Sequence, residues 1–536
     1  MPTSRTTSPS RRTETTAAAS AALPGALLDP AVYPHPAEAP ALVETHASWV
    51  VLAGAYAYKF KRPVRYAFLD YSTLDRRRAA CEAEVALNRR WAPTLYLDVV
   101  ELAATPDGPR LGVPGTGGEP AVRMRRFAAG DELGALLASR RVCAAELAAL
   151  GRAIADDHAA APLPDAASPF GSPATVRQAL EATLATLAGA DKAVGSGRRR
   201  TLAAWADAEF PLVEPLLAAR RASGRVRECH GDLHAGNVVR LDGRLVPFDG
   251  IEFSAALRTI DCAADAAFLA MDLEHHGRAD LAAAFLDAWL ERSGDFAAAG
   301  VLRWVLVDRA LVRAKVAMLA AQRAAAAAAP EAWGQVRAYC ATAERLATRP
   351  PGLIVITSGL SGSGKSRLAA ALVTQLPAVR LRSDVERKRL AGLAPLVRSD
   401  SPAGGGLYTR ALTRRTYARL ADCAGPLARA GISVLLDATY LEARERERAA
   451  AAARASLAPF AILECAAPVE VLYARLAARE GDPSEASLAV LERQLAAAEP
   501  LSAVERGRAL HIETGEPVDA CAIAGALRAA AVPPAG

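Results

Sequence analysis

Residues 359 to 366 read GLSGSGKS, and this stretch decides the fold of the C-terminal third of the chain. The apolar stretch LIVIT at 353 to 357 precedes it, and an alanine-rich helical pattern follows. Gly359, Gly362 and Gly364 let backbone N–H groups converge on an anion at a helix N-terminus, where the helix dipole favours negative charge. The spacing GxxxxGK[ST], in this strand–loop–helix context, is typical of a phosphate-binding loop.

The loop supplies the contacts that a nucleoside triphosphate needs. Lys365 can reach the β and γ phosphates of ATP, so we count it as catalytic as well as binding, and the Ser366 hydroxyl can bind Mg²⁺. ATP and Mg²⁺ are therefore the predicted cofactors. The predicted nucleotide-binding residues are Gly359, Leu360, Ser361, Gly362, Ser363, Gly364, Lys365 and Ser366.

Two aspartates follow strand-like stretches beyond the loop. Strands and helices alternate from residue 353 onward, which predicts an α/β domain with a doubly wound parallel sheet. Asp384 lies just past one strand, at the sheet edge where ligands bind, and can take a proton from an acceptor hydroxyl. Asp437 ends another strand and can support Mg²⁺. The alternative for each aspartate is that it caps the helix that follows.

Arg475 and Arg479 lie four residues apart on a predicted helix, so both project from one face. They can close over the γ phosphate as a lid and stabilise its charge. The alternative is an ordinary solvated basic face.

The region from about 350 to 515 resembles the P-loop kinases grouped with gluconate kinase, zeta toxins, chloramphenicol phosphotransferase and polynucleotide kinase. The likeness is carried by GLSGSGKS and by SDVERK at 383 to 388. It implies transfer of a γ phosphate to a hydroxyl, with Asp384 in the acceptor-activating position and Arg475 and Arg479 in the lid.

A second constellation, HGDLHAGN, occupies residues 230 to 237. Asp232 lies two residues after His230, Asn237 lies five after Asp232, and Asp249 follows beyond a predicted hairpin. A kinase-like catalytic loop needs an acid that orients the hydroxyl, and an Asn and an Asp that hold the metal. The spacing HxDxxxxN with a downstream Asp therefore predicts a second phosphotransfer site.

These residues resemble the family of aminoglycoside and choline phosphotransferases, whose signature is HGDxxxxN. The resemblance implies a protein-kinase-like α+β fold, with Asp232 as catalytic base, Asn237 and Asp249 as Mg²⁺ ligands, and His230 as the residue that braces the loop. The family also needs a strand Lys paired with a helix Glu.

Lys59 and Glu84 are the predicted Lys–Glu pair of this second site, where they would bind the nucleotide. Lys61 shares the face of Lys59, and Glu82 is a rival for Glu84. No glycine-rich loop separates the first two predicted strands, because residues 45 to 47 read THA. Because of this departure from the family pattern, we expect the N-terminal half to keep the kinase-like fold, but its catalysis is less certain than its fold.

The length of 536 residues favours at least two domains. We expect five segments: a disordered tail at 1–40, a kinase-like phosphotransferase domain at 41–348, a linker at 349–352, a P-loop kinase domain at 353–515, and a C-terminal helix and tail at 516–536.

The composition narrows the class of protein. A formal charge of +6 is too small to imply nucleic acid as a partner, and no apolar run approaches the ~20 residues of a membrane span. The eight scattered cysteines favour a reducing compartment, so we expect a cytoplasmic protein. The first 22 residues are rich in Ser and Thr, so we expect a disordered tail there and not an export signal.

The order of the two halves resembles proteins described as bifunctional aminoglycoside phosphotransferase/ATP-binding proteins. It implies two ATP- and Mg²⁺-dependent sites, each moving phosphate to a small-molecule hydroxyl. One alternative is a P-loop kinase regulated by a non-catalytic, ligand-binding N-terminal domain. Another is a P-loop ATPase acting on a partner. The sequence indicates neither the acceptors nor the oligomeric state.

Overall fold

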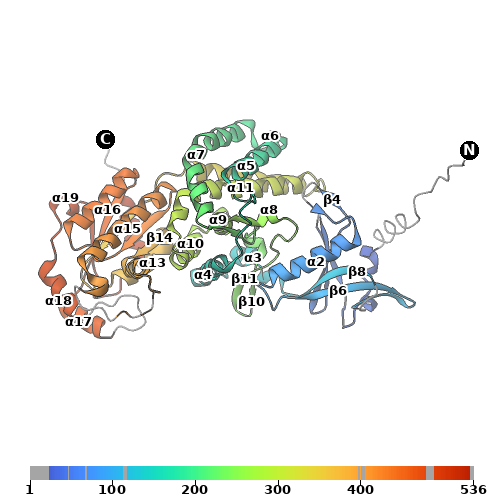
Figure 1. Ribbon diagram of the computed structural model, residues 1–536, viewed down its shortest axis with the longest axis horizontal. Coiled ribbons are helices and arrows are strands. Elements are labelled where there is room, and N and C mark those ends of the chain that lie inside the picture. The colour runs from blue at the N-terminus through green and yellow to red at the C-terminus, as the bar shows by residue number, and fades with distance from the viewer. Residues whose placement is uncertain are drawn as a thin grey trace, which may run out of the picture. The chain divides into compact units, whose positions relative to one another are not determined.

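The computed structural model describes residues 23–530 apart from 46, 67–68, 113–116, 396, 398, 400–404 and 479–487. The chain forms two compact units (Figure 1). The first consists of Met1–Ser139 and His230–Arg258, and the second of Arg140–Cys229 and Thr259–Gly536. The chain therefore leaves the first unit after Ser139, returns to it at His230, and leaves it again after Arg258.

The centre of the first unit is an antiparallel sheet. Among the described residues it has six strands in the order β1-β2-β3-β8-β6-β7. Its strands are β1 (Ala41–Glu44), β2 (Ser48–Ala53), β3 (Tyr56–Lys61), β6 (Tyr96–Thr105), β7 (Gly108–Leu111) and β8 (Glu119–Arg125). The other elements are β4 (Arg65–Tyr66), β5 (Leu69–Asp70), α2 (Leu74–Asn88), α3 (Leu133–Ala138), β10 (Val238–Leu241), β11 (Arg244–Pro247) and α8 (Ala255–Arg258).

Alternating side chains place apolar groups on both faces of this sheet. On one face, Cys81 and Val85 of α2 pack with Tyr96. On the other, Tyr58 and Phe60 pack with residues 27 to 37, which were expected to belong to a disordered tail. The structure differs there because Leu27, Val32 and Tyr33 cover apolar side chains of the sheet, a long-range contact that local composition does not reveal.

Helices dominate the first part of the second unit. They are α4 (Ala144–Ala160), α5 (Pro173–Leu187), α6 (Asp191–Val194), α7 (Ser196–Ala222), α9 (Cys262–His275), α10 (Ala279–Ser293), α11 (Ala299–Ala321) and α12 (Ala329–Ala347). A two-stranded ribbon joins β9 (Val226–Glu228) to β12 (Thr259–Asp261). Buried Arg220 donates to both Asp261 and Asp295 and so ties α7 to the start of α9. A buried charge must be paired in this way to be tolerated.

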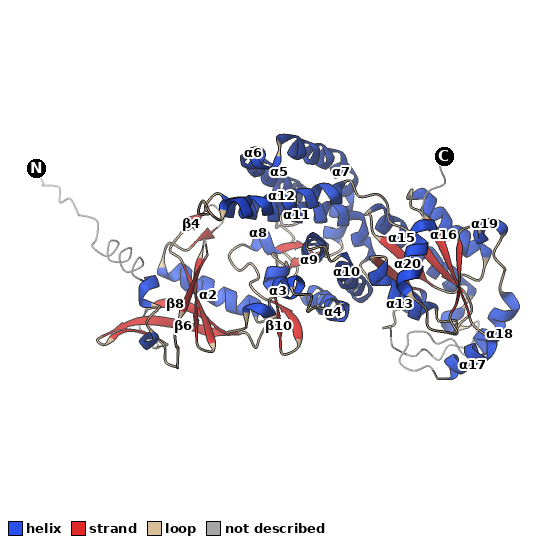
Figure 2. Cartoon of the chain, turned by 180° about the vertical axis from the view of Figure 1, so that it is seen from behind, coloured by secondary structure: helices blue, strands red, loops and turns tan. Residues whose placement is uncertain are grey.

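A five-stranded parallel sheet of the order β14-β15-β13-β16-β17 follows, within the described residues. Its strands are β13 (Ile354–Ser358), β14 (Ala378–Arg382), β15 (Ser433–Asp437), β16 (Phe460–Ala466) and β17 (Ala509–Glu513). The helices are α13 (Lys365–Gln375), α14 (Ser383–Leu390), α15 (Arg410–Arg429), α16 (Ala443–Ala455), α17 (Val469–Ala477), α18 (Leu488–Ala497), α19 (Ala503–Arg506) and α20 (Ala520–Ala530). Figure 2 shows helices on both faces of this sheet, so the predicted fold class is confirmed.

The core of the P-loop sheet extends beyond the boundaries expected from the sequence. Ile523 and Leu527 of α20 pack with Leu372 of α13 and with Val355, although α20 lies after residue 515. Ala283 of α10, from the helical part, belongs to the same apolar cluster. Sequence periodicity shows that these helices are amphipathic but not which sheet they cover.

The described part of the chain contains no helix that is both long and apolar enough to cross a membrane.

We expect Leu527→Ala to destabilise the P-loop sheet by about 2–5 kcal/mol, because it opens a cavity where α20 meets α13. Val518→Ala, at a more exposed position that precedes the same helix, is the control and should cost less than about 0.5 kcal/mol. Urea unfolding followed by loss of nucleotide binding measures both. Equal effects of the two variants would contradict the packing of α20.

Candidate active sites

The predicted catalytic loop HGDLHAGN lies between β9 and β10 in the first unit. His230 is buried, its Nδ1 accepts from the Asp232 amide at 3.3 Å, and its Nε2 lies 2.9 Å from the carbonyl of Phe248. Because Nδ1 is the acceptor, Nε2 carries the proton and donates to that carbonyl. His230 thus connects the loop to the end of β11, which is the geometry of a brace.

Asp232 and Asn237 lie together in this loop. The Asn237 amide nitrogen donates to the Asp232 carbonyl at 2.9 Å and to Asp232 Oδ2 at 3.1 Å. His234, which we did not single out from the sequence, places its Nε2 3.4 Å from the same carboxylate oxygen. The Asp232 side chain is 36% exposed, so a small molecule can reach it.

Asp249 follows β11 in a left-handed conformation with φ 60°, uncommon for a residue with a side chain. Its amide donates to the hydroxyl of Tyr96 at 3.0 Å, and the amide of Gly250 donates to Asn88 Oδ1 at 2.8 Å. These two contacts fix a conformation that is costly in isolation. Tyr96 and Asn88 were missed because neither belongs to the motif that predicted Asp249.

A buried ion-pair cluster joins Asp249 to β3 and α2. Lys59 donates to Glu84 Oε1 at 2.8 Å and also to Asp249, while Lys61 contacts Glu84 Oε2 and Glu252. Burial acts to raise the pKa of Glu84, but the two lysines outweigh it and lower the value to about 2. Burial likewise acts to lower the pKa of Lys59, yet Asp249 and Glu84 hold it well above the ordinary value.

The choice among rival residues follows from burial. Glu84 has no exposed side-chain surface, whereas Glu82 faces solvent on the same helix. Lys59 and Lys61 both bind the carboxylate of Glu84, so this pairing does not choose between the two lysines. The turn between β1 and β2 is tight: the Thr45 amide donates to the Ser48 carbonyl at 2.9 Å.

The GLSGSGKS loop of the second unit connects β13 to α13. Gly359 has a φ of 138°, and a Cβ there would lie 2.2 Å from the Cys465 carbonyl, so a side chain is excluded. Gly364, also at positive φ, precedes the first residue of α13, which directs the helix N-terminus at the loop. Lys365 is buried and donates to the Leu360 carbonyl at 2.5 Å.

A serine–aspartate pair lies beside this loop. Ser366 Oγ donates to Asp437 Oδ1 at 3.0 Å, and Asp437 is 4% exposed. The other carboxylate oxygen is buried and has no hydrogen-bond partner among the described residues. Burial raises the pKa of Asp437, opposed by Arg380 and Arg382. A buried carboxylate oxygen without a donor, next to a hydroxyl, fits a Mg²⁺ site.

The helix-cap alternatives do not hold for either aspartate. Asp384 lies inside the first turn of α14, whose N-cap residue is Arg382. Asp437 ends β15, and α16 is capped at Glu442. Arg382, the last residue of β14, is paired with Asp437, the last residue of β15. Asp384 follows Arg382 by two residues and therefore lies at the same end of the sheet as Asp437.

Of the two predicted lid residues, Arg475 lies within the described part of the chain. Arg475 on α17 donates to the Gly362 carbonyl at 3.2 Å and to the Thr514 carbonyl at 2.6 Å, so it lies against the phosphate loop. Arg479 lies outside the described residues. Gln494 on α18 was not predicted, and its Oε1 accepts from the amide of Ser361 at 2.8 Å.

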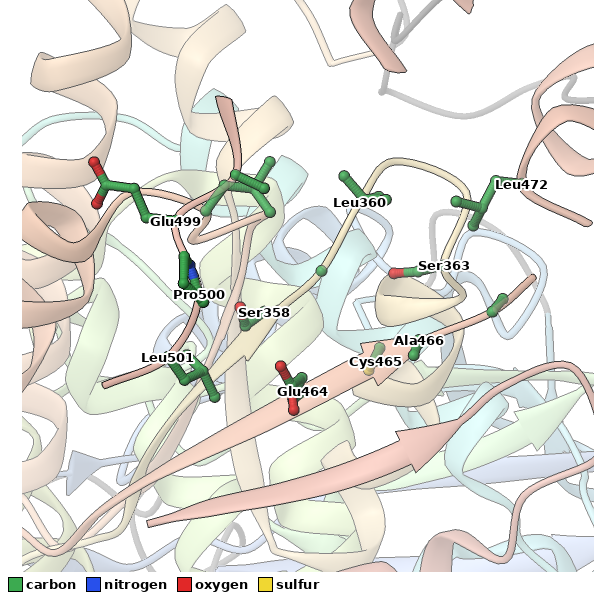
Figure 3. A pocket seen from close by; sticks show the side chains of 14 residues that line it. Ser358, Leu360, Ser363, Glu464, Cys465, Ala466, Leu472, Glu499, Pro500 and Leu501 are labelled. Carbon is green, nitrogen blue, oxygen red and sulfur yellow. The ribbon is translucent and has the colours of Figure 1, made fainter. Parts of the chain in front are cut away.

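A cavity of about 370 Å³ adjoins the loop (Figure 3). Its walls come from the loop, the end of β16, α17 and the segment before α19, and include Leu360, Ser363, Glu464, Leu472 and Pro500. The size and mostly apolar lining are typical of a site for part of a small molecule.

The sequence of the chain is similar to a family model and to proteins from mycobacteria. Residues 354–501 match the family model described as AAA domain. Uncharacterized protein Rv2004c of Mycobacterium tuberculosis is 32% identical over 445 residues, which cover 83% of this chain and 87% of that protein. Uncharacterized protein Mb2027c of Mycobacterium bovis matches equally. The chain belongs to the family of these mycobacterial proteins.

Two solved structures that are similar to parts of the chain are a choline kinase and a gluconokinase. Choline kinase from Cryptosporidium parvum Iowa II is 10% identical, with a TM-score of 0.38, and covers 57% of this chain and 89% of its own. A gluconokinase from Sinorhizobium meliloti 1021 is 21% identical, with a TM-score of 0.23, and covers 34% and 91%.

The family match and the two sets of residues agree with the sequence-based interpretation. The region that matches the AAA-domain model follows the predicted catalytic-loop residues and the Lys59–Glu84 pair, in the order expected from the sequence.

We expect Glu84→Gln to weaken the first unit by about 3–5 kcal/mol, because the neutral amide removes the buried carboxylate that both ammonium groups share and leaves Lys59 with Asp249 and Lys61 with Glu252 alone. Glu82→Gln on the exposed side of α2 removes the same charge and should have no such effect. Thermal unfolding and ATP affinity of the full chain distinguish the two. Similar losses in both variants would contradict Glu84 as the shared partner.

Proposed function

We propose that this chain carries two ATP- and Mg²⁺-dependent sites, each of which transfers the γ phosphate to a hydroxyl of a small molecule. The observation that carries the proposal is the buried Ser366–Asp437 pair beside the glycine loop, because one of its carboxylate oxygens lacks a donor. The proposed acceptors are small molecules and not nucleic acids, and the proposed location is the cytoplasm.

In the P-loop site, the loop amides and Lys365 bind the phosphates, and Ser366 and Asp437 hold the metal. Mg²⁺, when bound, neutralises charge that develops on the transferring phosphoryl group. Asp384 takes the proton of the acceptor hydroxyl as that oxygen attacks. Arg475 stabilises the phosphates from α17, and Lys365 exchanges the Leu360 carbonyl for phosphate oxygens.

In the kinase-like site, Glu84 holds Lys59 toward the nucleotide phosphates, and Asn237 and Asp249 are the metal ligands. Asp232 orients the acceptor hydroxyl and accepts its proton, while His230 keeps the loop in register with the end of β11. The exposed carboxylate of Asp232 and the buried, paired Lys59 support this division of roles.

A second candidate function is that the kinase-like region binds a ligand without catalysis and regulates the P-loop site. Two observations favour it: the β1–β2 turn is closed by Thr45 where a glycine-rich loop would cover the nucleotide, and Lys59 already contacts Asp249. A P-loop ATPase that acts on a partner is the third candidate. Phosphate transfer to a panel of sugars, amino alcohols, nucleosides and aminoglycosides separates the three.

We expect Lys365→Ala to reduce ATP affinity or turnover at the P-loop site by ~100-fold or more, since it deletes a charge directed at the transferring phosphate. The measurement uses the full chain with Asp249→Ala, which silences the other site. Arg367→Ala, on the exposed face of the same helix, is the matched control and should keep wild-type values. Unchanged binding and turnover in Lys365→Ala would rule out the phosphate cradle.

The kinase-like site is tested in the full chain with Lys365→Ala as background. Asp249→Ala should abolish Mg²⁺-dependent nucleotide binding, whereas Asp232→Asn should keep binding and lower turnover by ~100-fold or more. Asp242→Asn, at the exposed hairpin turn, controls for the loss of an acidic group. Turnover that survives Asp232→Asn rejects Asp232 as the base, and nucleotide binding with no turnover in the parent supports the regulatory function.

A further inference from the structure

Helix α10 covers the edge of the P-loop sheet, although it lies in the region expected to form the kinase-like domain. It contacts α13 and β14 (Figure 1). Ala283 shares an apolar cluster with Leu372 and Val355. β14 is the edge strand, paired only with β15 among the described strands. The backbone amide of Arg380 in β14 donates to Asp287 Oδ1 of α10 at 2.6 Å. A side chain of the helix thus satisfies an edge amide that would otherwise have no strand partner.

The side chain of Arg380 connects α10 to the proposed metal site. One guanidinium nitrogen donates to the Ser366 carbonyl at 3.2 Å and lies 3.9 Å from Asp437 Oδ2, the oxygen without a hydrogen-bond partner. Another lies 3.9 Å from Glu291 Oε2, one turn after Asp287 on α10. The Arg380 side chain is 14% exposed, so its planar group is held between these partners and not in solvent.

A second set of contacts ties α10 to the helix that carries Asp384. Arg389 of α14 donates to the Glu291 carbonyl at 2.6 Å, near the C-terminus of α10, where a cation is favoured. Glu386 of the same helix is buried and pairs with Arg389 and Arg419. The orientation of α14 therefore depends on the end of α10 as well as on its own strand.

We propose that Arg380 is a positioning residue of the P-loop site, and that Asp287 and Glu291 of α10 hold it in place. The inference rests on the proposed function of that site. Arg380 donates to the backbone carbonyl of Ser366 and lies 3.9 Å from Asp437 Oδ2, so it orients the two residues whose side chains would bind the metal. Helix α10, which precedes the linker, then contributes to the geometry of the P-loop site through Asp287 and Glu291.

The test uses the full chain with Asp249→Ala, and its probes are ATP and Mg²⁺ alone. Arg380→Met should raise the Mg²⁺ concentration for half-maximal ATP hydrolysis by ~10-fold or more, as expected for loss of a residue that orients metal ligands. Binding of a fluorescent ATP analogue in EDTA should stay within about twofold, since the loop amides and Lys365 are untouched. Arg380→Lys keeps the charge but not the planar fork, and should recover part of the loss.

Asp287→Ala should raise the Mg²⁺ requirement in the same direction but less, because Glu291 still faces Arg380. Arg292→Ala, on the exposed side of α10, is the control and should match the parent. A purely structural role predicts that Arg380→Met weakens metal-free nucleotide binding together with the Mg²⁺ dependence, and that result overturns the proposal. If Arg380→Met does not fold, Arg380→Lys decides, and an unchanged Mg²⁺ requirement overturns the proposal.

Failure of the proposed function gives a different pattern. Lys365→Ala in the same background then leaves binding and hydrolysis unchanged, so no P-loop site exists to be positioned. If Lys365→Ala abolishes hydrolysis while Arg380→Met keeps the Mg²⁺ requirement within about twofold, the site stands and only the role of Arg380 is rejected.

Discussion

The parallel register of β14, β15, β13 and β16 is the constraint on which the P-loop half depends. It pairs Arg382 with Asp437 and Ser358 with Glu464, so the strands end at one edge. The glycine loop starts from that edge, which is why Ser366 meets Asp437. A slip of one residue would reverse the faces of β15 and exchange Asp437 with the apolar Leu436. The buried serine–aspartate pair is thus a consequence of strand pairing more than of the loop itself.

The sequence predicts what is encoded locally. The glycine loop, the catalytic-loop signature and the alternation of strands and helices depend on spacing within short stretches, and the fold class follows from them. The distinction between Glu84 and Glu82 needs burial, which periodicity on α2 does not give. Gln494 and Arg380 have no motif, because their roles depend on which helix packs where. The assigned roles of the site residues remain predictions from pattern, now with a geometry that can be tested.

In the function that we propose, the two halves hold anionic phosphate by different physical means. In the P-loop half, backbone amides and a helix N-terminus provide the positive potential, so glycine is required where a Cβ would collide. In the kinase-like half, side chains do so, through two lysines on one buried glutamate. A backbone cradle depends on conformation, whereas a side-chain cluster depends on charge balance. Salt and pH should therefore affect the two halves unequally.

The packing of α10 on the P-loop sheet bears on how the chain is made. Residues 279 to 293 leave the ribosome before β13 and β14, so the segment that covers the sheet edge is already available when the strands emerge. The sheet can then assemble against α10, and the Arg380 amide at its edge can donate to the Asp287 carboxylate as soon as β14 pairs with β15. Expression of the P-loop half by itself would deprive the edge strand of that cover and leave it open to pairing with other chains.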